Sequence, residues 1–318
     1  MMVYSSMKIK HQKEPKATIK VIKGDAFSIE TAPHLPKLHQ AQIIVARRGQ
    51  FKTTAVSNQL RMYKETGTMD KIIIVSSTFK SNRAILEQLD IDPDDVFDDP
   101  EEPGIIKAII AKVEALRDDF LRWRKLSLEY EKVKKQMKLG YVPDDETLLS
   151  LYDVSTNSFR LPEPTYECYT KGRPPVVAVV FDDVLGSKVL NDRSLISLTQ
   201  RHRHIASFSK EDNVPYNAVG VSLYFLVQSF KSQSGLNRSI RNQATSALIG
   251  RCKDLKELKD IAESFSGEID PETFMKVHHE ATKDSPHHFL MIDLHPKPHQ
   301  HQFRKNFDEY LIVEESVK

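Results

Sequence analysis

Residues 42–54 read QIIVARRGQFKTT, which is an apolar strand, a basic turn and the start of a helical segment. A phosphate-binding loop has the form GxxxxGK[ST]. Its glycines let backbone N–H groups point at phosphate oxygens, its lysine reaches the phosphates, and its hydroxyl binds Mg²⁺. The positions that fit are Gly49, Lys52 and Thr53, whereas Ala46 and Phe51 stand where the two defining glycines would be. On this stretch alone, a phosphate-binding loop and an ordinary strand-to-helix turn are equally good interpretations.

A second stretch, VVAVVFDD at residues 176–183, is an apolar strand that ends in two carboxylates. Nucleoside triphosphatases place one acid there to hold Mg²⁺ and a neighbouring acid to orient or deprotonate the attacking water. We expect Asp182 in the first role and Asp183 in the second, although aspartates also commonly begin a polar loop. Both motifs follow apolar strands in the expected order. They therefore favour a nucleotide site, with Lys52 and Asp182 at two adjacent strand ends.

Short β-branched runs alternate with helical stretches along the chain. This pattern is typical of an α/β protein with a mostly parallel sheet and crossover helices, and consecutive apolar residues predict strands buried on both faces. The expected strands are Thr18–Ile22, Gln42–Ala46, Lys71–Ser76, Val176–Phe181, Val221–Val227, Ala247–Gly250 and His288–Leu294.

Residues 90–175 interrupt this pattern, and we expect no core strand there. The segment includes an acidic loop, IDPDDVFDDPEEPG at 91–104, which should be solvated. It continues as a helix over about Ile105–Leu139, whose apolar face is formed by Ile109, Val113, Leu116, Phe120 and Trp123. The opposite face carries Arg122, Arg124, Lys125, Lys132, Lys134, Lys135 and Lys138. Acidic residues among them favour a solvated face over a DNA-facing or partner-facing stripe.

The strand at Val221–Val227 is followed by Gln228, which could position a water or read the γ-phosphate, or simply bond to its own loop. An arginine supplied by a neighbouring subunit commonly neutralises charge in such sites. The candidates are Arg201, Arg203, Arg238 and Arg241. Spacing does not choose among them, and most of the four must be structural or DNA-facing.

Composition limits the partners and the compartment. The 46 basic and 44 acidic residues give a net charge of +2, so any DNA contact must come from local patches rather than a global cationic field. The apolar runs are too short for a membrane span, and the N-terminus does not read as a secretory signal. With only Cys168 and Cys252, outside any CxxC, the sequence excludes a disulfide framework or cysteine-rich metal site and favours a reducing intracellular compartment.

Seven of the twelve histidines lie near the C-terminal end, where HPKPHQH invites a metal site. No carboxylate or cysteine completes a usual ligand spacing, so surface histidines are the favoured interpretation. The seven are His278, His279, His287, His288, His295, His299 and His301.

Several segments, taken in order, resemble one family. They are RRGQFKTT, VVAVVFDDVLG, RHRHIAS, the strand ending in Gln228, NRSIRNQ, and HFLMIDL followed by FRKNFDEYL. Together they resemble the genome-packaging ATPases of nucleocytoplasmic large DNA viruses and their relatives, in the FtsK/HerA group of RecA-like motors. The family normally has glycine where Phe51 stands. Phe51 cannot easily take a positive φ, and we expect its side chain to lie against the phosphates.

The resemblance implies a RecA-like P-loop NTPase fold, with a mostly parallel central sheet flanked by helices and a helical insertion. We divide the chain into a flexible N-terminal segment, residues 1–17, and an ATPase domain, residues 18–318, with the insertion at about 90–175. The implied ligands are ATP and Mg²⁺. The nucleotide would be bound by Arg48, Gly49, Gln50, Phe51, Lys52, Thr53 and Thr54. Thr53 and Asp182 would hold the metal, Asp183 the water, and Gln228 would act as sensor.

The implied function is ATP-driven translocation of double-stranded DNA by a homo-oligomeric ring that packages a viral genome. The expected place is the virion or the host-cell cytoplasm, without secretion, and viral capsid or vertex proteins are candidate partners. Two alternatives stay open. One is a degenerate, non-hydrolysing ring or docking subunit, for which Phe51 is the argument. The other is a helicase or DNA-transfer motor of the same group, because a fold does not fix a function.

Overall fold

The computed structural model describes residues 29, 31–78, 83–153, 157–231, 235–252, 254–267, 269–296 and 298–313. The expected flexible segment at residues 1–17 and the expected strand at Thr18–Ile22 lie outside these described residues. The remaining expected strands all form, with ends that differ by at most two residues and with Val221–Val227 as expected.

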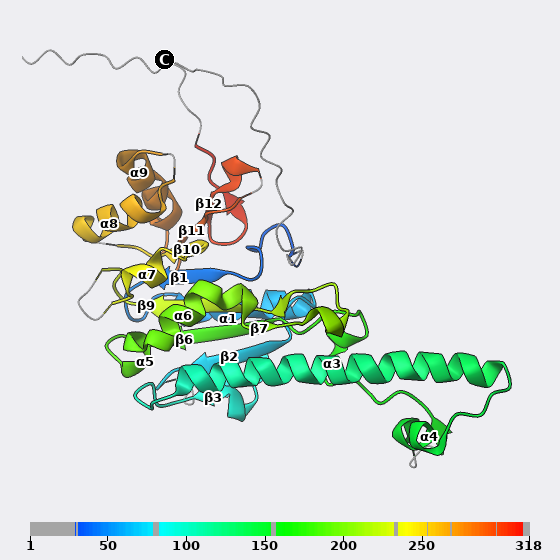
Figure 1. Ribbon diagram of the computed structural model, residues 1–318. Helices are drawn as coiled ribbons and strands as arrows, with labels where there is room; N and C mark the ends of the chain where they lie inside the picture. Colours follow the sequence, from blue (N-terminus) through cyan, green and yellow to red (C-terminus); the bar gives the residue numbers. More distant parts are fainter. Residues whose placement is uncertain are drawn as a thin grey trace, which may run out of the picture.

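The central feature is a nine-stranded sheet in the order β13-β12-β11-β10-β1-β9-β6-β2-β3 (Figure 1). The six strands from β10 to β3 are parallel to their neighbours, and β11, β12 and β13 continue the sheet in antiparallel fashion. The strands are β1 (Ala41–Val45), β2 (Lys71–Val75), β3 (Val96–Phe97), β6 (Val177–Asp182), β9 (Val221–Val227), β10 (Ser246–Ile249), β11 (Leu290–Asp293), β12 (Phe303–Lys305) and β13 (Glu309–Tyr310). Two small hairpins pair β4 (Tyr152–Asp153) with β5 (Ser158–Phe159), and β7 (Ala206–Ser207) with β8 (Ala218–Val219).

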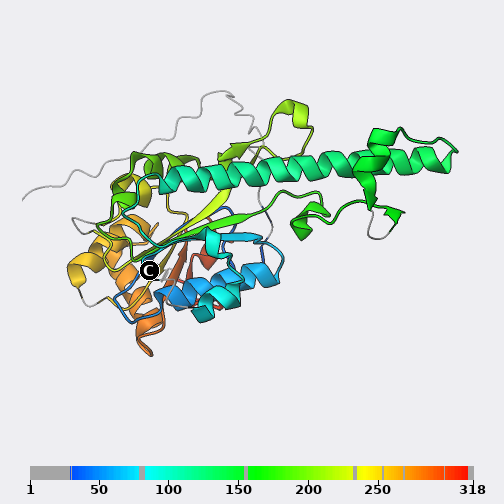
Figure 2. The same ribbon diagram turned by 90° about the horizontal axis from the view of Figure 1, so that it is seen from below.

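Helices cover both faces of this sheet. The helices of the described residues are α1 (Lys52–Glu65), α2 (Arg83–Leu89), α3 (Ile105–Lys138), α4 (Asp145–Leu151), α5 (Lys188–Asn191), α6 (Arg193–Arg201), α7 (Arg238–Arg241), α8 (Leu255–Phe265) and α9 (Pro271–Thr282), of which α4 lies away from the sheet. Figure 2 shows α1 and α2 on one side of the sheet and the long helix α3 on the other. The fold is thus the expected α/β class, a mostly parallel sheet between layers of helices.

Numbered along the chain, the five principal parallel strands lie in the order 5-1-4-3-2, which is a RecA-like arrangement. The expectation that Lys52 and Asp182 follow adjacent strands is wrong, because β9 lies between β1 and β6. All three strands point the same way, so their carboxyl ends still meet at one edge of the sheet. This order places Gln228, which follows β9, between the basic loop and the acidic strand.

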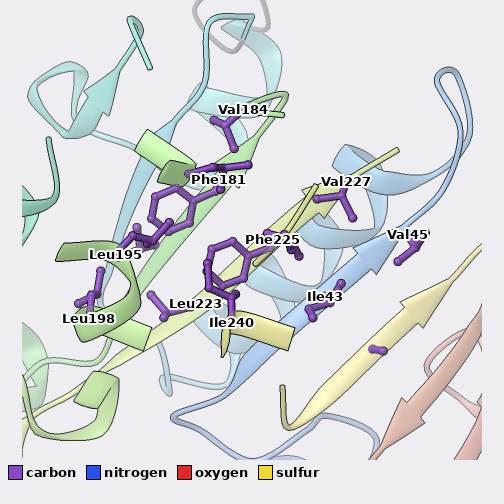
Figure 3. Close-up of a cluster of buried hydrophobic side chains, with 14 of the residues drawn as sticks. Ile43, Val45, Phe181, Val184, Leu195, Leu198, Leu223, Phe225, Val227 and Ile240 are labelled. Carbon is purple, nitrogen blue, oxygen red and sulfur yellow. The ribbon is translucent and has the colours of Figure 1, made fainter. Parts of the chain in front are cut away.

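Alternate residues of the strands supply two apolar cores. Ile43 and Val45 point to the side covered by α3, α6 and α7, whereas Ile44 points to the side covered by α1. On the first side, the Phe181 and Phe225 rings, both labelled in Figure 3, stack. Their centroids are 5.1 Å apart. Because both faces are buried, β1, β6, β9 and β10 read as continuous apolar runs rather than alternating ones.

The interrupting segment contributes more to the body than the sequence predicted. Two of its residues, Val96–Phe97, form β3 at the edge of the central sheet, paired with β2. Nor is the acidic loop wholly solvated. Asp95 is buried, and its carboxylate is bridged by Lys71 Nζ at 2.5 Å and Lys112 Nζ at 3.0 Å. Two cations on β2 and α3 offset the cost of burying this charge, which hydropathy alone does not anticipate.

The expected long helix is confirmed, because α3 ends one residue before the predicted Leu139. Its buried residues include Ile109, Val113 and Phe120, all from the predicted apolar face. Among the helices of the described residues, none combines the length and the apolar composition needed to cross a membrane.

Candidate active site

The loop between β1 and α1 turns at Gly49. Gly49 has a φ of +76°, a left-handed conformation that glycine adopts without the steric cost of a side chain. Phe51 has a φ of −100° and is the residue that precedes the first turn of α1. A positive φ is therefore not needed at position 51, and a side chain there does not strain the loop.

The Phe51 ring points into the protein, not toward the mouth of the loop. Only 4% of Phe51 is exposed, and its ring stacks on Phe289 of the β11 region with centroids 4.7 Å apart. The expectation that this side chain lies against the phosphates is wrong. Burial in the α1-side core explains the difference, because an aromatic ring there removes apolar surface from water and anchors the loop to the sheet.

Gly250, at the end of β10, makes room for this anchor. A Cβ built on Gly250 would lie 2.6 Å from Phe51 Cε1 and 2.8 Å from Gln50 Oε1. The Gln50 side chain in turn accepts a hydrogen bond from the Arg47 backbone N–H at 3.1 Å. Gly250 could not be singled out from the sequence, since a single glycine after a strand carries no signature of its own.

Two further residues support the same strand end in ways that the sequence did not indicate. His278 Nε2 lies 2.9 Å from the Gly250 carbonyl oxygen, and the His278 ring is buried. The guanidinium of Arg251 donates to the Thr282 and Lys283 carbonyls at 2.6 to 3.1 Å, at the end of α9. The strand beside the loop is thereby fixed to α9.

Lys52 folds back over the loop. Its ammonium donates to the Ala46 carbonyl at 2.8 Å and to the Arg47 carbonyl at 3.1 Å. Partial burial lowers the pKa of Lys52, while the nearby charges of Asp182 and Asp183 act in the opposite direction. The lysine is thus held where the loop, the start of α1 and the two aspartates converge.

The start of α1 can receive an anion. The first residues of a helix have backbone N–H groups without an intrahelical partner, and the helix dipole makes that end positive. Phe51 has no side-chain acceptor to cap them, and the first turn, Lys52 to Thr54, contains no acid. Arg48, Gly49 and Thr54 are exposed beside this end. A helix N-terminus in this setting is suited to a phosphate group.

A direct contact joins the basic loop to the acidic strand. Thr53 Oγ1 donates to Asp182 Oδ2 at 3.0 Å. Asp182 is only 6% exposed, and burial raises the pKa of its carboxyl group, while the Thr53 hydrogen bond and the Lys52 charge oppose that shift. A hydroxyl and a buried carboxylate side by side are oxygen ligands of the kind that Mg²⁺ prefers.

The second acid stands in a different setting. Asp183 is exposed and has a φ of +55°, an uncommon conformation for a residue with a side chain. Gln228 Nε2 donates to Asp183 Oδ1 at 3.3 Å, which brings the end of β9 to the end of β6. Strained residues of this kind cluster at functional sites. The side chain that the sequence assigned to the water is held toward solvent, next to the expected sensor.

Of the four candidate arginines, Arg201 and Arg203 lie away from this site. Arg203 lies next to Gly220. A Cβ built on Gly220 would be 2.9 Å from the carbonyl oxygen of Arg203. Gly220 precedes β9, whereas Asp182 ends the neighbouring β6, so Arg203 lies at the opposite edge of the sheet from Asp182. Arg201, at the end of α6, is also exposed. A side chain at the amino ends of these parallel strands could reach a nucleotide only on another copy of the chain.

The remaining two arginines differ from each other. Arg241 Nη1 donates to the Leu236 carbonyl at 2.8 Å and the Phe230 carbonyl at 3.3 Å, and its guanidinium lies over the Phe230 ring. Arg241 thus braces its own loop. Arg238 is exposed at the start of the same short helix, α7.

The C-terminal histidines serve varied structural roles. His278 was expected at the surface but is buried, because its ring bonds the Gly250 carbonyl under the loop. The His301 ring stacks on Tyr310 with centroids 4.0 Å apart. Within the part of the chain that the structure describes, no group of three or more His, Cys, Asp or Glu side chains is arranged to hold a metal ion.

No protein-family model matches this sequence, and the search of curated proteins found no match. Three solved structures similar to this chain are ATPases 2 and 3 of EssC from Geobacillus thermodenitrificans, the genome-packaging NTPase B204 from Sulfolobus turreted icosahedral virus 2 with AMP, and the pCW3 conjugation coupling protein TcpA. Their sequence identities are 14%, 12% and 14%, and their TM-scores are 0.38, 0.41 and 0.37.

The matches cover 88%, 86% and 80% of this chain and 41%, 98% and 58% of the other chains, in the same order. The chain therefore spans less than half of the EssC structure. At these identities the likeness is one of fold. With TM-scores below 0.5, the likeness carries no statement about what this chain does.

Proposed function

We propose that the chain binds ATP with Mg²⁺ at the carboxyl edge of its sheet and hydrolyses it to drive movement of double-stranded DNA. The observation that carries the proposal is the 3.0 Å hydrogen bond between Thr53 and Asp182. It unites two motifs far apart in sequence at the point where a phosphate-binding loop and a metal-holding acid would have to meet.

Each residue of the loop has a distinct part in binding. The uncapped N–H groups at the start of α1 would bind phosphate oxygens. The Lys52 ammonium would exchange its loop carbonyls for the β and γ phosphates, which are stronger acceptors because they are charged. Thr53 and Asp182 would hold Mg²⁺, which supplies charge neutralisation at the phosphates. The Lys52 hydrogen bonds to the Ala46 and Arg47 carbonyls hold its ammonium over the loop, where the phosphates would bind.

The two groups on the neighbouring strand ends would act on water. Asp183 is the exposed acid, and its Oδ1 accepts from Gln228 Nε2. In the bound state Asp183 would orient the attacking water and accept its proton, and Gln228 would align the carboxylate and respond to the γ-phosphate. Asp182 cannot share this task, because it is buried against Thr53.

An arginine from a second copy would complete the site. Because Arg201 and Arg203 lie at the sheet edge opposite Asp182, they could serve only in trans, and Arg238 is exposed as well. Arg241 is the weakest candidate, since two backbone carbonyls hold it. Assembly as a homo-oligomeric ring would bring such an edge of one copy to the nucleotide of the next.

The DNA role rests on the order of motifs that resembles the genome-packaging ATPases. The FDD block, the RHRH segment, Gln228 and the RxxRN segment are moderately specific as a set. Packaging of a viral genome is the form of translocation that this resemblance favours. The degenerate subunit is the less favoured alternative, because Phe51 was its argument and the Phe51 ring is turned into the core.

Isothermal titration calorimetry with Mg·ATP tests the nucleotide site. Lys52→Ala should abolish binding, whereas Lys259→Ala, which removes an exposed lysine of α8, should leave the affinity unchanged. Equal affinities of the wild type and Lys52→Ala would refute the site.

A further inference from the structure

The second half of α3 extends beyond the rest of the molecule (Figures 1 and 2). The helix has 34 residues, which corresponds to about 51 Å at 1.5 Å per residue. Its first half is packed on the sheet through residues such as Ile106 and Val113. From residue 121 onward only Val133 is buried. We call residues 121–139, together with α4 and the β4–β5 hairpin, the arm.

The arm is a folded structure rather than a bare helix. Tyr130 of α3 stacks on Phe159 of β5 with ring centroids 5.3 Å apart. Leu151, at the end of α4, is 1% exposed, and Asp144 caps the start of α4 by accepting the Thr147 N–H at 2.8 Å. These contacts hold the tip of the arm in a defined form, so its free face can serve as a surface.

That free face carries a regular stripe of cations and leucines. Its members follow one another at helical spacings of three and four, and all five are exposed: Lys125, Leu128, Lys132, Lys135 and Leu139. Leu128 is 63% exposed and Leu139 is 76% exposed. We call these five residues the cationic stripe. Such a combination on one helix face is suited to a partner that is acidic and also offers apolar contact.

A surface of opposite charge lies at the other end of the same helix. The acidic loop, residues 91–104, contains seven acidic residues and no lysine or arginine. Asp95 is buried between two lysines, but the other six acids are exposed. The loop also presents Phe97, which is only partly buried, and prolines. The loop ends at Gly104, directly before the first residue of α3. The loop therefore lies at the start of α3 and the stripe near its end (Figure 1).

In place of the solvated face favoured from the sequence, we propose that the cationic stripe of one copy docks on the acidic loop of a second copy. The two surfaces are complementary in charge, and they lie at opposite ends of one rigid helix, so one molecule cannot join its own two ends. Contacts of this head-to-tail kind join copies in series and close into rings where the rotation permits. The exposed leucines favour a protein partner over the phosphate backbone of DNA. This contact is independent of the proposed nucleotide chemistry.

Charge reversal on each surface tests the contact by sedimentation velocity of the full chain without nucleotide. The stripe variant is Lys132→Glu with Lys135→Glu, and the loop variant is Asp94→Lys with Glu102→Lys. Each variant alone should associate at least about tenfold more weakly than the wild type, because like charges then face each other. An equimolar mixture should regain association, because each variant retains the surface that complements its partner. The control variant, Lys256→Glu with Lys259→Glu on α8, should behave as the wild type does.

Three results would overturn the proposal. One is association of the stripe variant equal to that of the wild type, and another is failure of the mixture to regain association when both variants keep the wild-type circular dichroism. The third is a wild type that stays monomeric at every concentration. If the stripe variant associates normally but loses binding to double-stranded DNA, the stripe faces DNA and not a second copy.

Discussion

Thr53 and Asp182 are 129 positions apart in the chain, and yet the Thr53 hydroxyl donates a 3.0 Å hydrogen bond to the Asp182 carboxylate. The contact crosses the end of β9, which lies between β1, the strand before the Thr53 loop, and β6, the strand that ends at Asp182. It defines the centre of the proposed site, because the residues that would bind phosphate, metal and water all surround this pair.

Asp183→Asn should leave nucleotide affinity largely unchanged and reduce turnover by orders of magnitude. The amide keeps the shape of the side chain but cannot accept a proton from water. Calorimetry and steady-state hydrolysis, measured on the same preparation, separate the two effects. Wild-type turnover in this variant would place the general base elsewhere.

Asp182→Asn should raise the thermal stability of the nucleotide-free protein at pH 7. Burial raises the pKa of Asp182 above its ordinary value of 3.8, so the folded state holds the proton more tightly than the unfolded state does. The ionised carboxylate therefore disfavours folding, and this penalty grows as the pH rises from 3.8 through the folded pKa.

The measurement is the difference in Tm between Asp182→Asn and the wild type across pH, so that titrations common to both proteins cancel. The gain should shrink as the pH falls toward 3.8. At pH 7 the same variant should lose Mg²⁺-dependent tightening of ATP binding, because an amide is a weaker metal ligand than a carboxylate. A lower Tm than the wild type at pH 7 would contradict this account.

Phe51→Gly should destabilise the protein without improving ATP affinity. The ring is 4% exposed and packs on Phe289, so its loss leaves a cavity that costs roughly 3–5 kcal/mol, as for other buried aromatic side chains. Chemical denaturation gives the free energy of unfolding, and Phe51→Leu, which keeps most of the apolar volume, serves as the milder comparison. Tighter ATP binding by Phe51→Gly at unchanged stability would mean that the ring does crowd the phosphates.

Mixing variants should reveal the arginine that acts in trans. A Lys52→Ala subunit has a disabled loop but an intact arginine, and an Arg-deficient subunit has the reverse, so mixed assemblies contain some complete sites. Hydrolysis by the mixture should exceed that of either variant for one of Arg201, Arg203 or Arg238. Arg241→Ala is the structural comparison, and we expect it to lower stability because Arg241 braces the Phe230 and Leu236 carbonyls. Absence of rescue for all three would exclude them.

Most of the sheet could be predicted from sequence because its strands are buried on both faces. Runs such as VVAVVF are apolar on both faces, and central strands between two layers of helices bury both faces. The long helix was predicted equally well, since its apolar residues repeat every three or four positions over many turns. The order of the strands was not, because periodicity carries no information on which strand lies beside which. The insertion of β9 between β1 and β6 is therefore visible only in three dimensions.

The site was predictable where chemistry requires a residue type and not where packing decides. Lys52, Thr53, Asp182 and Asp183 do lie at one edge of the sheet. Phe51 was misjudged because a motif gives a residue's position but not the direction of its side chain. The supports from Gly250, His278 and Arg251 were missed for a related reason, since each acts through backbone carbonyls or space, which leaves no mark in the sequence.

Steady-state ATP hydrolysis, measured with and without double-stranded DNA for the wild type and Lys52→Ala, tests the central proposal most directly. A DNA-driven motor should hydrolyse ATP with Mg²⁺, should turn over faster when double-stranded DNA is added, and should lose both activities in Lys52→Ala. Absence of hydrolysis by the wild type under all these conditions, or equal hydrolysis by Lys52→Ala, would contradict the account.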